Sequence, residues 1–148
     1  MKPEGAGAEK VREIFYRANF VRDLDIRLDK IGEGICETSL MVVDRLRQQH
    51  GFVHGGVIAT LADHTAGGAA RSVSGDKDVL TVEFKINYLR PAIGDQLRCT
   101  ATVLRAGKTM IVAEALVFCS NEGKELLVAK LTETLFVADD PKARTKTI

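Results

Sequence analysis

One carboxylate stands alone in an otherwise uncharged segment of the sequence. From Gly51 to Ala70, Asp63 is the only residue charged at neutral pH, and most of its neighbours are small or apolar. A helix that is apolar on nearly all sides is expected inside a structure. An ionised carboxylate there costs several kcal/mol unless it is paired or hydrogen-bonded. Asp63 is therefore a candidate nucleophile or general base, and the alternative is a structural carboxylate that bonds across an interface.

A pair of glycines, Gly55 and Gly56, precedes Asp63 in the same segment. A helix that begins here presents unpaired backbone N–H groups and the positive end of its dipole. Glycine also lets a ligand approach the backbone closely. Such donors suit a carbonyl oxygen that becomes an oxyanion, with the Gly55 N–H as the main donor and the Gly56 N–H as a second. The alternative is that the glycines only allow close packing of a strand on the helix.

The composition excludes several classes of protein. The chain has 148 residues, 45% of them hydrophobic, with 21 Lys and Arg against 20 Asp and Glu. This length predicts one domain, residues 1–148, with flexible tails at about 1–8 and 139–148. The balanced charge gives no case for a nucleic-acid binder, and no apolar run is long enough to span a membrane. Three separated cysteines and three histidines predict no disulfide framework and no metal site, and we expect a cytoplasmic protein.

The elements that must position these residues can be predicted from periodicity. An amphipathic helix is predicted from about Glu9 to Phe20, and Leu24, Ile26 and Leu28 then alternate as in a strand. A turn at residues 32–34 leads into a returning strand, Ile35 to Val43. Four strands follow the buried helix, at Val79–Leu89, Gln96–Leu104, Met110–Ser120 and Glu125–Val137. An antiparallel sheet wrapped around one long central helix is the economical α+β fold.

The first of these four strands has an apolar and a polar face. Strict alternation places Val82, Phe84, Ile86 and Tyr88 on one face and Thr81, Glu83, Lys85 and Asn87 on the other.

Two segments carry a family resemblance. Residues 48–63 (QQHGFVHGGVIATLAD), followed by residues 81–92 (TVEFKINYLRPA), resemble hotdog-fold acyl-CoA thioesterases of the phenylacetate-degradation and 4-hydroxybenzoyl-CoA thioesterase type. The resemblance extends from about Ala18 to Ala138. It implies a hotdog fold and hydrolysis of an acyl-CoA thioester to a carboxylate and free CoA. The thioester is the substrate, and no cofactor or metal is implied.

The resemblance also implies roles for individual residues. Gln48 stands where relatives have an Asn or Gln that binds the thioester carbonyl or orients water, although Gln49 leaves the register open by one residue. Thr81 stands where relatives have a hydroxyl near the carboxylate, and the alternative is an ordinary strand residue. His54 opens the helix and shapes the substrate pocket, and we expect a buried, hydrogen-bonded structural histidine. His50 and His64 are expected to be structural.

CoA carries phosphates, so basic residues should line its approach. Arg90, and Lys108 with Thr109 in a glycine turn, match family positions near the nucleotide, and the alternative for each charge is a solvated surface position.

Two other functions remain open. A hotdog hydratase or dehydratase would need a catalytic His paired with a carboxylate, in motifs that the sequence lacks. A non-catalytic acyl-CoA-binding regulator would usually add a helix-turn-helix segment, and the stretch before Val21 is too short for one.

The spacing of the candidate residues predicts the assembly. Gly55 and Asp63 lie about 12 Å apart along one helix, at 1.5 Å per residue. Both must reach the same carbonyl to within about 3 to 4 Å. Two chains can supply both groups if their central helices lie antiparallel across a two-fold axis. The sequence therefore predicts a homodimer as the minimal active unit, paired further into a homotetramer.

Overall fold

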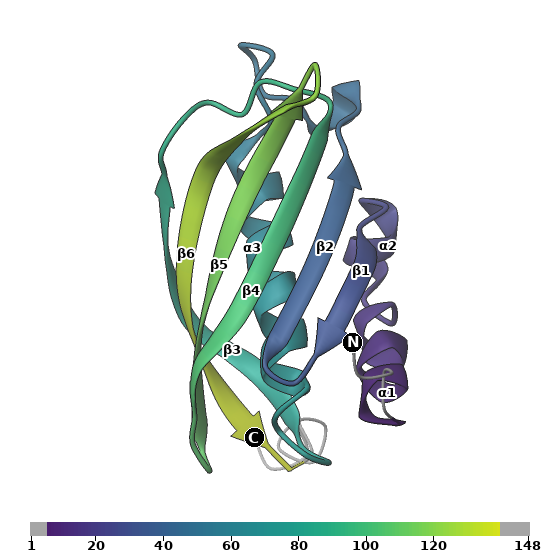
Figure 1. Cartoon of the computed structure of the whole chain (residues 1–148), viewed down its shortest axis with the longest axis vertical. Helices are drawn as coiled ribbons and strands as arrows, with labels where there is room; N and C mark the ends of the chain where they lie inside the picture. Colours follow the sequence, from purple (N-terminus) through teal and green to yellow (C-terminus); the bar gives the residue numbers. More distant parts are fainter. Residues whose placement is uncertain (1–5, 140–148) are drawn as a thin grey trace, which may run out of the picture.

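The computed structural model describes residues 6–139 of the chain. Its elements, in chain order, are α1 (Ala6–Phe15), α2 (Asn19–Asp23), β1 (Arg27–Gly32), β2 (Ile35–Met41), a 3₁₀ turn (Asp44–Leu46), α3 (Gly55–Arg71), β3 (Asp78–Tyr88), β4 (Gln96–Ala106), β5 (Met110–Asn121) and β6 (Lys124–Ala138). The strands lie in front of α3 in Figure 1, with α1 and α2 beside β1.

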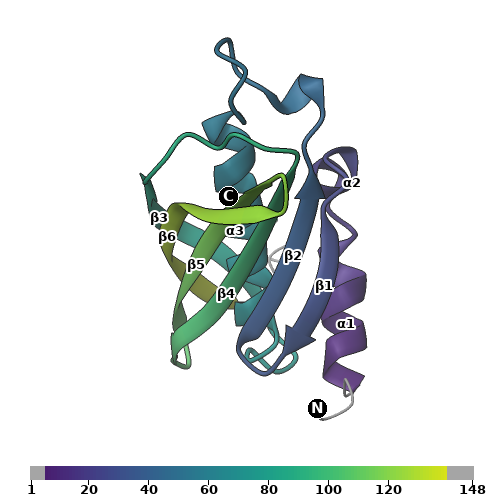
Figure 2. The same cartoon turned by 45° about the horizontal axis from the view of Figure 1, so that its top comes forward.

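The strands form one antiparallel sheet that curves around the central helix. Its order is β1-β2-β4-β5-β6-β3, so β1 and β3 are the two edges. Helix α3 contacts every strand of the sheet, and the curvature is clear when the molecule is tilted (Figure 2). This is the predicted α+β hotdog architecture. The four strands predicted after the central helix are confirmed, each with small differences at its ends.

Small side chains allow α3 to lie close to the sheet. Ala62, Ala66, Ala69 and Ala70 of the helix are fully buried, as is Leu61. A Cβ atom at Gly68 would lie only 2.9 Å from the Cys36 Sγ of β2, so any larger residue there would push the helix away from the sheet. The helix is therefore held by close contact along its length.

The N-terminal region differs from the prediction in three ways. The predicted helix is divided, because the Arg17 N–H bonds back to the Ile14 carbonyl and tightens the last turn of α1. The strand begins at Arg27 rather than near Leu24, because Asp25 has a left-handed φ of 54° that no strand accommodates. Helix α1 begins at Ala6, within the predicted tail. The rest of that tail, and residues 140–148, lie outside the described residues.

A bulge in β3 changes which residues share a face. Thr81 pairs with Leu135 and Phe84 pairs with Glu133, while Val82 is the extra residue between Thr81 and Glu83. Leu135 and Glu133 are alternate residues of β6 and lie on one face. Thr81 therefore lies on the same face as Phe84, and the predicted strict alternation along this strand is wrong.

Two further predictions concern the described residues. None of their helices is long and apolar enough to cross a membrane. Cys36, Cys99 and Cys119 are free and buried, and burial raises the pKa of each thiol, so these side chains remain protonated at neutral pH.

A pair of buried threonines joins α3 to the sheet. The hydroxyls of Thr38 in β2 and Thr65 in α3 lie 2.7 Å apart, and the Thr65 hydroxyl donates to the Leu61 carbonyl at 2.6 Å. Because Thr65 has one hydroxyl proton and gives it to Leu61, Thr38 must be the donor to Thr65.

Thr65→Val is expected to cost more stability than Thr38→Val. Thr65→Val leaves the buried Thr38 hydroxyl without an acceptor, which lowers the free energy of unfolding by about 1–3 kcal/mol. Thr38→Val removes the Thr38 hydroxyl itself, so no buried donor is left unsatisfied. The double variant is expected to recover part of the loss. Urea unfolding of the four proteins measures this cycle, and equal losses in the two single variants would contradict the assigned donor.

Candidate active site

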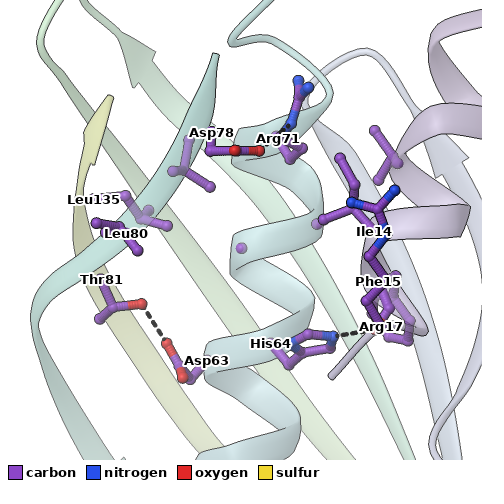
Figure 3. A pocket seen from close by; sticks show the side chains of 14 residues that line it. Ile14, Phe15, Arg17, Asp63, His64, Arg71, Asp78, Leu80, Thr81 and Leu135 are labelled. Atoms are coloured by element: carbon purple, nitrogen blue, oxygen red, sulfur yellow. Dashed lines mark hydrogen bonds and ion pairs between the residues drawn. The ribbon is translucent and has the colours of Figure 1, made fainter. Parts of the chain in front are cut away.

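Asp63 is held by a hydroxyl from the edge strand. It lies in α3 and is half-buried, and the Thr81 Oγ1 donates a hydrogen bond to Asp63 Oδ1 at 2.8 Å. Figure 3 shows the two side chains pointing toward each other across the gap between α3 and β3. The bulge in β3 is what turns Thr81 toward the helix. The sequence predicted both residues, and the structure brings them together.

A second carboxyl group contacts the same hydroxyl. Glu133 Oε1 of β6 lies 2.7 Å from Thr81 Oγ1, and the Glu133 side chain is fully buried. Its Oε2 has no hydrogen-bond partner in the part of the chain that the structure describes. Burial, followed by the nearby negative charge of Asp63, raises the pKa of Glu133 to about 9. Glu133 therefore carries a proton at neutral pH.

Sequence reasoning missed Glu133, although a signal was present. Along the last strand, Ala129, Leu131, Glu133 and Leu135 occupy alternate positions, and all four are buried. A glutamate in an otherwise apolar alternating row is a candidate for a buried, functional carboxyl group. We refer to Asp63, Thr81 and Glu133 as the carboxylate half-site.

A cavity of about 320 Å³ opens beside Asp63, and its lining combines apolar side chains with the charged Arg17, Arg71 and Asp78. Its walls come from α1, α3, β3 and β6, and they include Ile14, Phe15, Leu80 and Leu135 (Figure 3). Such a space suits an apolar group of modest size next to a carboxylate.

His64 also lines this cavity, but it is directed toward α1. Its Nε2 lies 3.0 Å from the Phe15 carbonyl oxygen, and burial lowers its pKa. A neutral imidazole that bonds a backbone carbonyl is a structural histidine, as predicted.

The beginning of α3 offers one free backbone donor. His54 is the N-cap, and its Nδ1 accepts a hydrogen bond from the Gly56 N–H at 2.8 Å. The Gly55 N–H has no acceptor among the described residues, so it can bind a ligand oxygen, and the Gly56 N–H is already used. His54 is hydrogen-bonded as predicted but exposed rather than buried, because an N-cap side chain lies outside the helix end.

Gln48 is turned so that its amide nitrogen remains available. Its Oε1 accepts backbone hydrogen bonds from His50 and Phe52, which leaves the Nε2 group as the donor that can contact a ligand. Gln48 lines a second cavity of about 370 Å³ together with Gly55, Tyr88 and Arg90, whereas Gln49 is exposed and is not among the residues of this cavity.

Tyr88 belongs to this second group and was not predicted as a site residue. Its hydroxyl donates to the Gly55 carbonyl at 2.7 Å, and burial raises its pKa. The apolar face of the strand included Tyr88, but nothing in the sequence indicated a contact with Gly55. We refer to Gln48, Gly55 and Tyr88 as the amide half-site.

One chain keeps the two half-sites apart. Thr81 pairs with Leu135 of β6 and Tyr88 pairs with Ala129, which is six residues or about 20 Å away along that strand. The two cavities share no lining residue. A single thioester group cannot contact both half-sites of one chain.

The predicted CoA-binding residues lie at opposite ends of β6, near different half-sites. Arg90 donates to the Leu127 carbonyl at 2.8 Å, near the amide half-site. Lys108 and Thr109 lie in the turn between β4 and β5, where the Thr109 carbonyl accepts from the Val137 N–H. Leu127 and Val137 are ten residues apart on β6, or about 30 Å. Within one chain, the turn therefore lies nearer the carboxylate half-site.

In residues 6–139, no group of three or more His, Cys, Asp or Glu side chains is arranged to hold a metal ion.

Comparison with known proteins gives consistent matches. Residues 50–126 match the family described as the thioesterase superfamily. A thioesterase family protein from Silicibacter pomeroyi has the same fold, with a TM-score of 0.89 and 37% identity, over 91% of this chain and 100% of that one.

Two curated relatives have named activities. A 1,4-dihydroxy-2-naphthoyl-CoA hydrolase of Listeria monocytogenes is 30% identical, over 74% of this chain and 89% of its own length. A medium/long-chain acyl-CoA thioesterase of Salmonella typhimurium is 30% identical, over 86% of this chain and 91% of its own length.

Replacing Glu133 by Gln is expected to change how stability depends on pH. The pKa of this carboxyl is about 9 in the folded chain and 4.5 ordinarily, so between these values the folded state holds a proton that the unfolded chain has lost. Its stabilising contribution is full below about pH 4.5 and is lost as the pH rises through about 9. Urea unfolding at about pH 5, 7 and 9 should show wild type weakening relative to Glu133→Gln. A difference between the two proteins that is constant with pH would contradict the raised pKa.

Proposed function

We propose that this chain, which belongs to the thioesterase superfamily, hydrolyses an acyl-CoA thioester to a carboxylate and free CoA. The observation that carries the proposal is the Asp63 carboxylate, held by Thr81 at 2.8 Å beside a partly apolar cavity. A carboxylate in that setting can act as a nucleophile or can activate water. The apolar walls of this cavity suit an acyl group.

The amide half-site supplies the other requirement of the reaction. As a thioester carbonyl becomes tetrahedral, negative charge develops on its oxygen. The unpaired Gly55 N–H and the positive end of α3 would stabilise this charge, and the Gln48 Nε2 would bind the carbonyl or orient water. The Tyr88 hydroxyl holds the Gly55 carbonyl, so the peptide that carries the donor keeps its orientation. The reaction then requires only the substrate, water and these groups.

Both half-sites can serve one thioester if two chains share the site. An antiparallel arrangement of two α3 helices across a two-fold axis would bring the carboxylate half-site of one chain to the amide half-site of the other. Each dimer would then hold two complete sites. The division of the CoA-binding candidates supports the same arrangement, because Arg90 of one chain and Lys108 of the other would approach the same site.

The edge strand β3 is the surface that supports this dimer. It ends the sheet, and its side chains Leu80, Val82, Phe84 and Tyr88 are exposed in the isolated chain. A long apolar edge strand normally pairs or is covered. Pairing of β3 with its two-fold copy would continue the sheet and would place the two α3 helices on the same side of it. The proposed partner is therefore a second copy of this chain.

Replacing Asp63 by Asn is expected to lower kcat at least about a hundredfold, because Asn is neither a nucleophile nor a base at this position. Release of free CoA, followed with a thiol reagent, measures turnover on aryl-acetyl, hydroxybenzoyl and medium-chain acyl-CoA. Asn is isosteric, so the fold should be kept, and circular dichroism and urea unfolding check this.

Three outcomes would contradict the proposal. The first is turnover near wild type in a folded Asp63→Asn protein, and the second is a substrate panel at background for the wild type. The third is hydration of an enoyl-CoA, or tight acyl-CoA binding, without thiol release, which would favour a hydratase or a binding protein.

A mixture of two inactive variants tests the shared site. Gln48→Ala and Asp63→Ala chains are unfolded together and refolded. In a mixed dimer, one site has both lesions and the other has neither. With random pairing half of the dimers are mixed, so about a quarter of wild-type activity should return under this symmetry. A mixture that remains inactive, although mass spectrometry shows exchanged chains, would exclude the shared site.

A further inference from the structure

The Thr81 hydroxyl contacts two carboxyl groups but has one proton. Asp63 Oδ1 lies at 2.8 Å and Glu133 Oε1 at 2.7 Å, both within hydrogen-bond distance. Two ionised carboxylates would both need a donor, and a single hydroxyl can satisfy only one of them. The contact that it does not satisfy must take its proton from the carboxyl group itself. One of the two acids is therefore protonated when both contacts are formed.

Burial decides which acid keeps the proton. Glu133 is fully buried, whereas Asp63 is half-buried and lines a cavity that reaches solvent. Removing a carboxylate from water disfavours its charged form, so the proton remains on the more buried group. Glu133 then donates to Thr81 Oγ1, and Thr81 donates to Asp63.

The charges around Glu133 also favour its protonated form. From α3 it faces Asp63, whose negative charge and side-chain hydrogen bond both raise the pKa of Glu133, and the neighbouring His64 is directed to the Phe15 carbonyl. From β3 the negative charge of Glu83 also raises the pKa of Glu133, and the Glu83 carboxylate accepts a hydrogen bond from Thr134. On β5 its pairing partner is the uncharged Ala113, and Glu114 is ion-paired with Lys130 at 3.6 Å. The groups that shift the pKa of Glu133 most are thus negative or neutral.

We propose that Glu133 is a positioning residue for the hydrolysis: as a neutral acid it holds the Thr81 hydroxyl in the orientation that donates to the ionised Asp63. This rests on the proposed function, since Asp63 is the reacting group. Glu133 acts through Thr81 and need not touch the substrate. When Glu133 loses its proton, it competes for the Thr81 proton, and Asp63 loses its fixed donor.

Glu133→Gln is the sharpest test, because the Gln amide donates to Thr81 at every pH and cannot ionise. Wild-type kcat/KM is expected to fall at alkaline pH with an apparent pKa near 9, the value to which burial raises the pKa of the Glu133 carboxyl. In Glu133→Gln this alkaline fall should disappear or move up by at least about one pH unit. Rates are corrected for uncatalysed hydrolysis.

Two further variants separate positioning from general support of the fold. Glu133→Leu removes the donor to Thr81 and is expected to lower kcat about tenfold with little change in KM. In a Thr81→Val background, the same Glu133→Leu change should have a much smaller effect on kcat, because the part of the link to Asp63 that runs through Thr81 is already absent. Glu114→Gln is the matched control: it makes the same change on the neighbouring strand, at a residue paired with the exposed Thr132, and should keep the alkaline fall.

The protonation state can be observed without any activity measurement. Infrared difference spectra between wild type and Glu133→Gln near neutral pH should contain the C=O stretch of a protonated carboxylic acid. Carboxylate bands alone would overturn the inference, as would an unchanged alkaline fall in Glu133→Gln.

The failure of this inference can be told from failure of the proposed function. If folded Asp63→Asn turns over normally, the proposed function fails, while the infrared result still reports on Glu133. If Asp63→Asn is inactive and Glu133 is ionised at neutral pH, only the positioning role fails.

Discussion

The close contact between α3 and the sheet is the constraint on which the other features depend. The helix presents alanines and glycines to the strands, and Gly68 lies so near Cys36 that no side chain fits between them. Packing at this distance leaves no room for water beside a polar group. A fully buried polar side chain of the helix, such as Thr65, therefore needs a partner from a strand, and Thr38 provides it. Asp63, which lines the cavity, is held by Thr81.

The main outline of the fold could be predicted from the sequence because most of its elements have clear local signals. The strands after the central helix are separated by glycine-containing or charged turns, and each has a clear apolar alternation, so they were located to within a few residues. From Ala8 to Ile31 the sequence has no glycine or proline to mark a boundary. Leu24, Ile26 and Leu28 are buried, as their alternation predicted, but the left-handed backbone at Asp25 prevents this segment from forming a strand.

Some residues of the candidate site could be predicted from local sequence features, whereas others depend on contacts between distant strands. Asp63 and Gly55 could be found because a lone charge and a helix start are local features of the sequence. Thr81 was named through the family resemblance, while plain alternation placed it on the wrong face, since a bulge depends on pairing between distant strands. Glu133 contacts Thr81 across 52 positions in the chain, and only the folded sheet brings the two together.

Two separate parts of the chain form the wall of the cavity beside Asp63. Ile14 and Phe15 come from α1, which lies at the β1 edge, while Asp63 and Thr81 come from the helix–sheet contact. Ile14 lines the cavity but takes no part in the hydrogen bond that holds the carboxylate. The shape of the cavity and the placement of the Asp63 carboxylate are thus set by different elements, so a change in α1 can alter the first and leave the second in place.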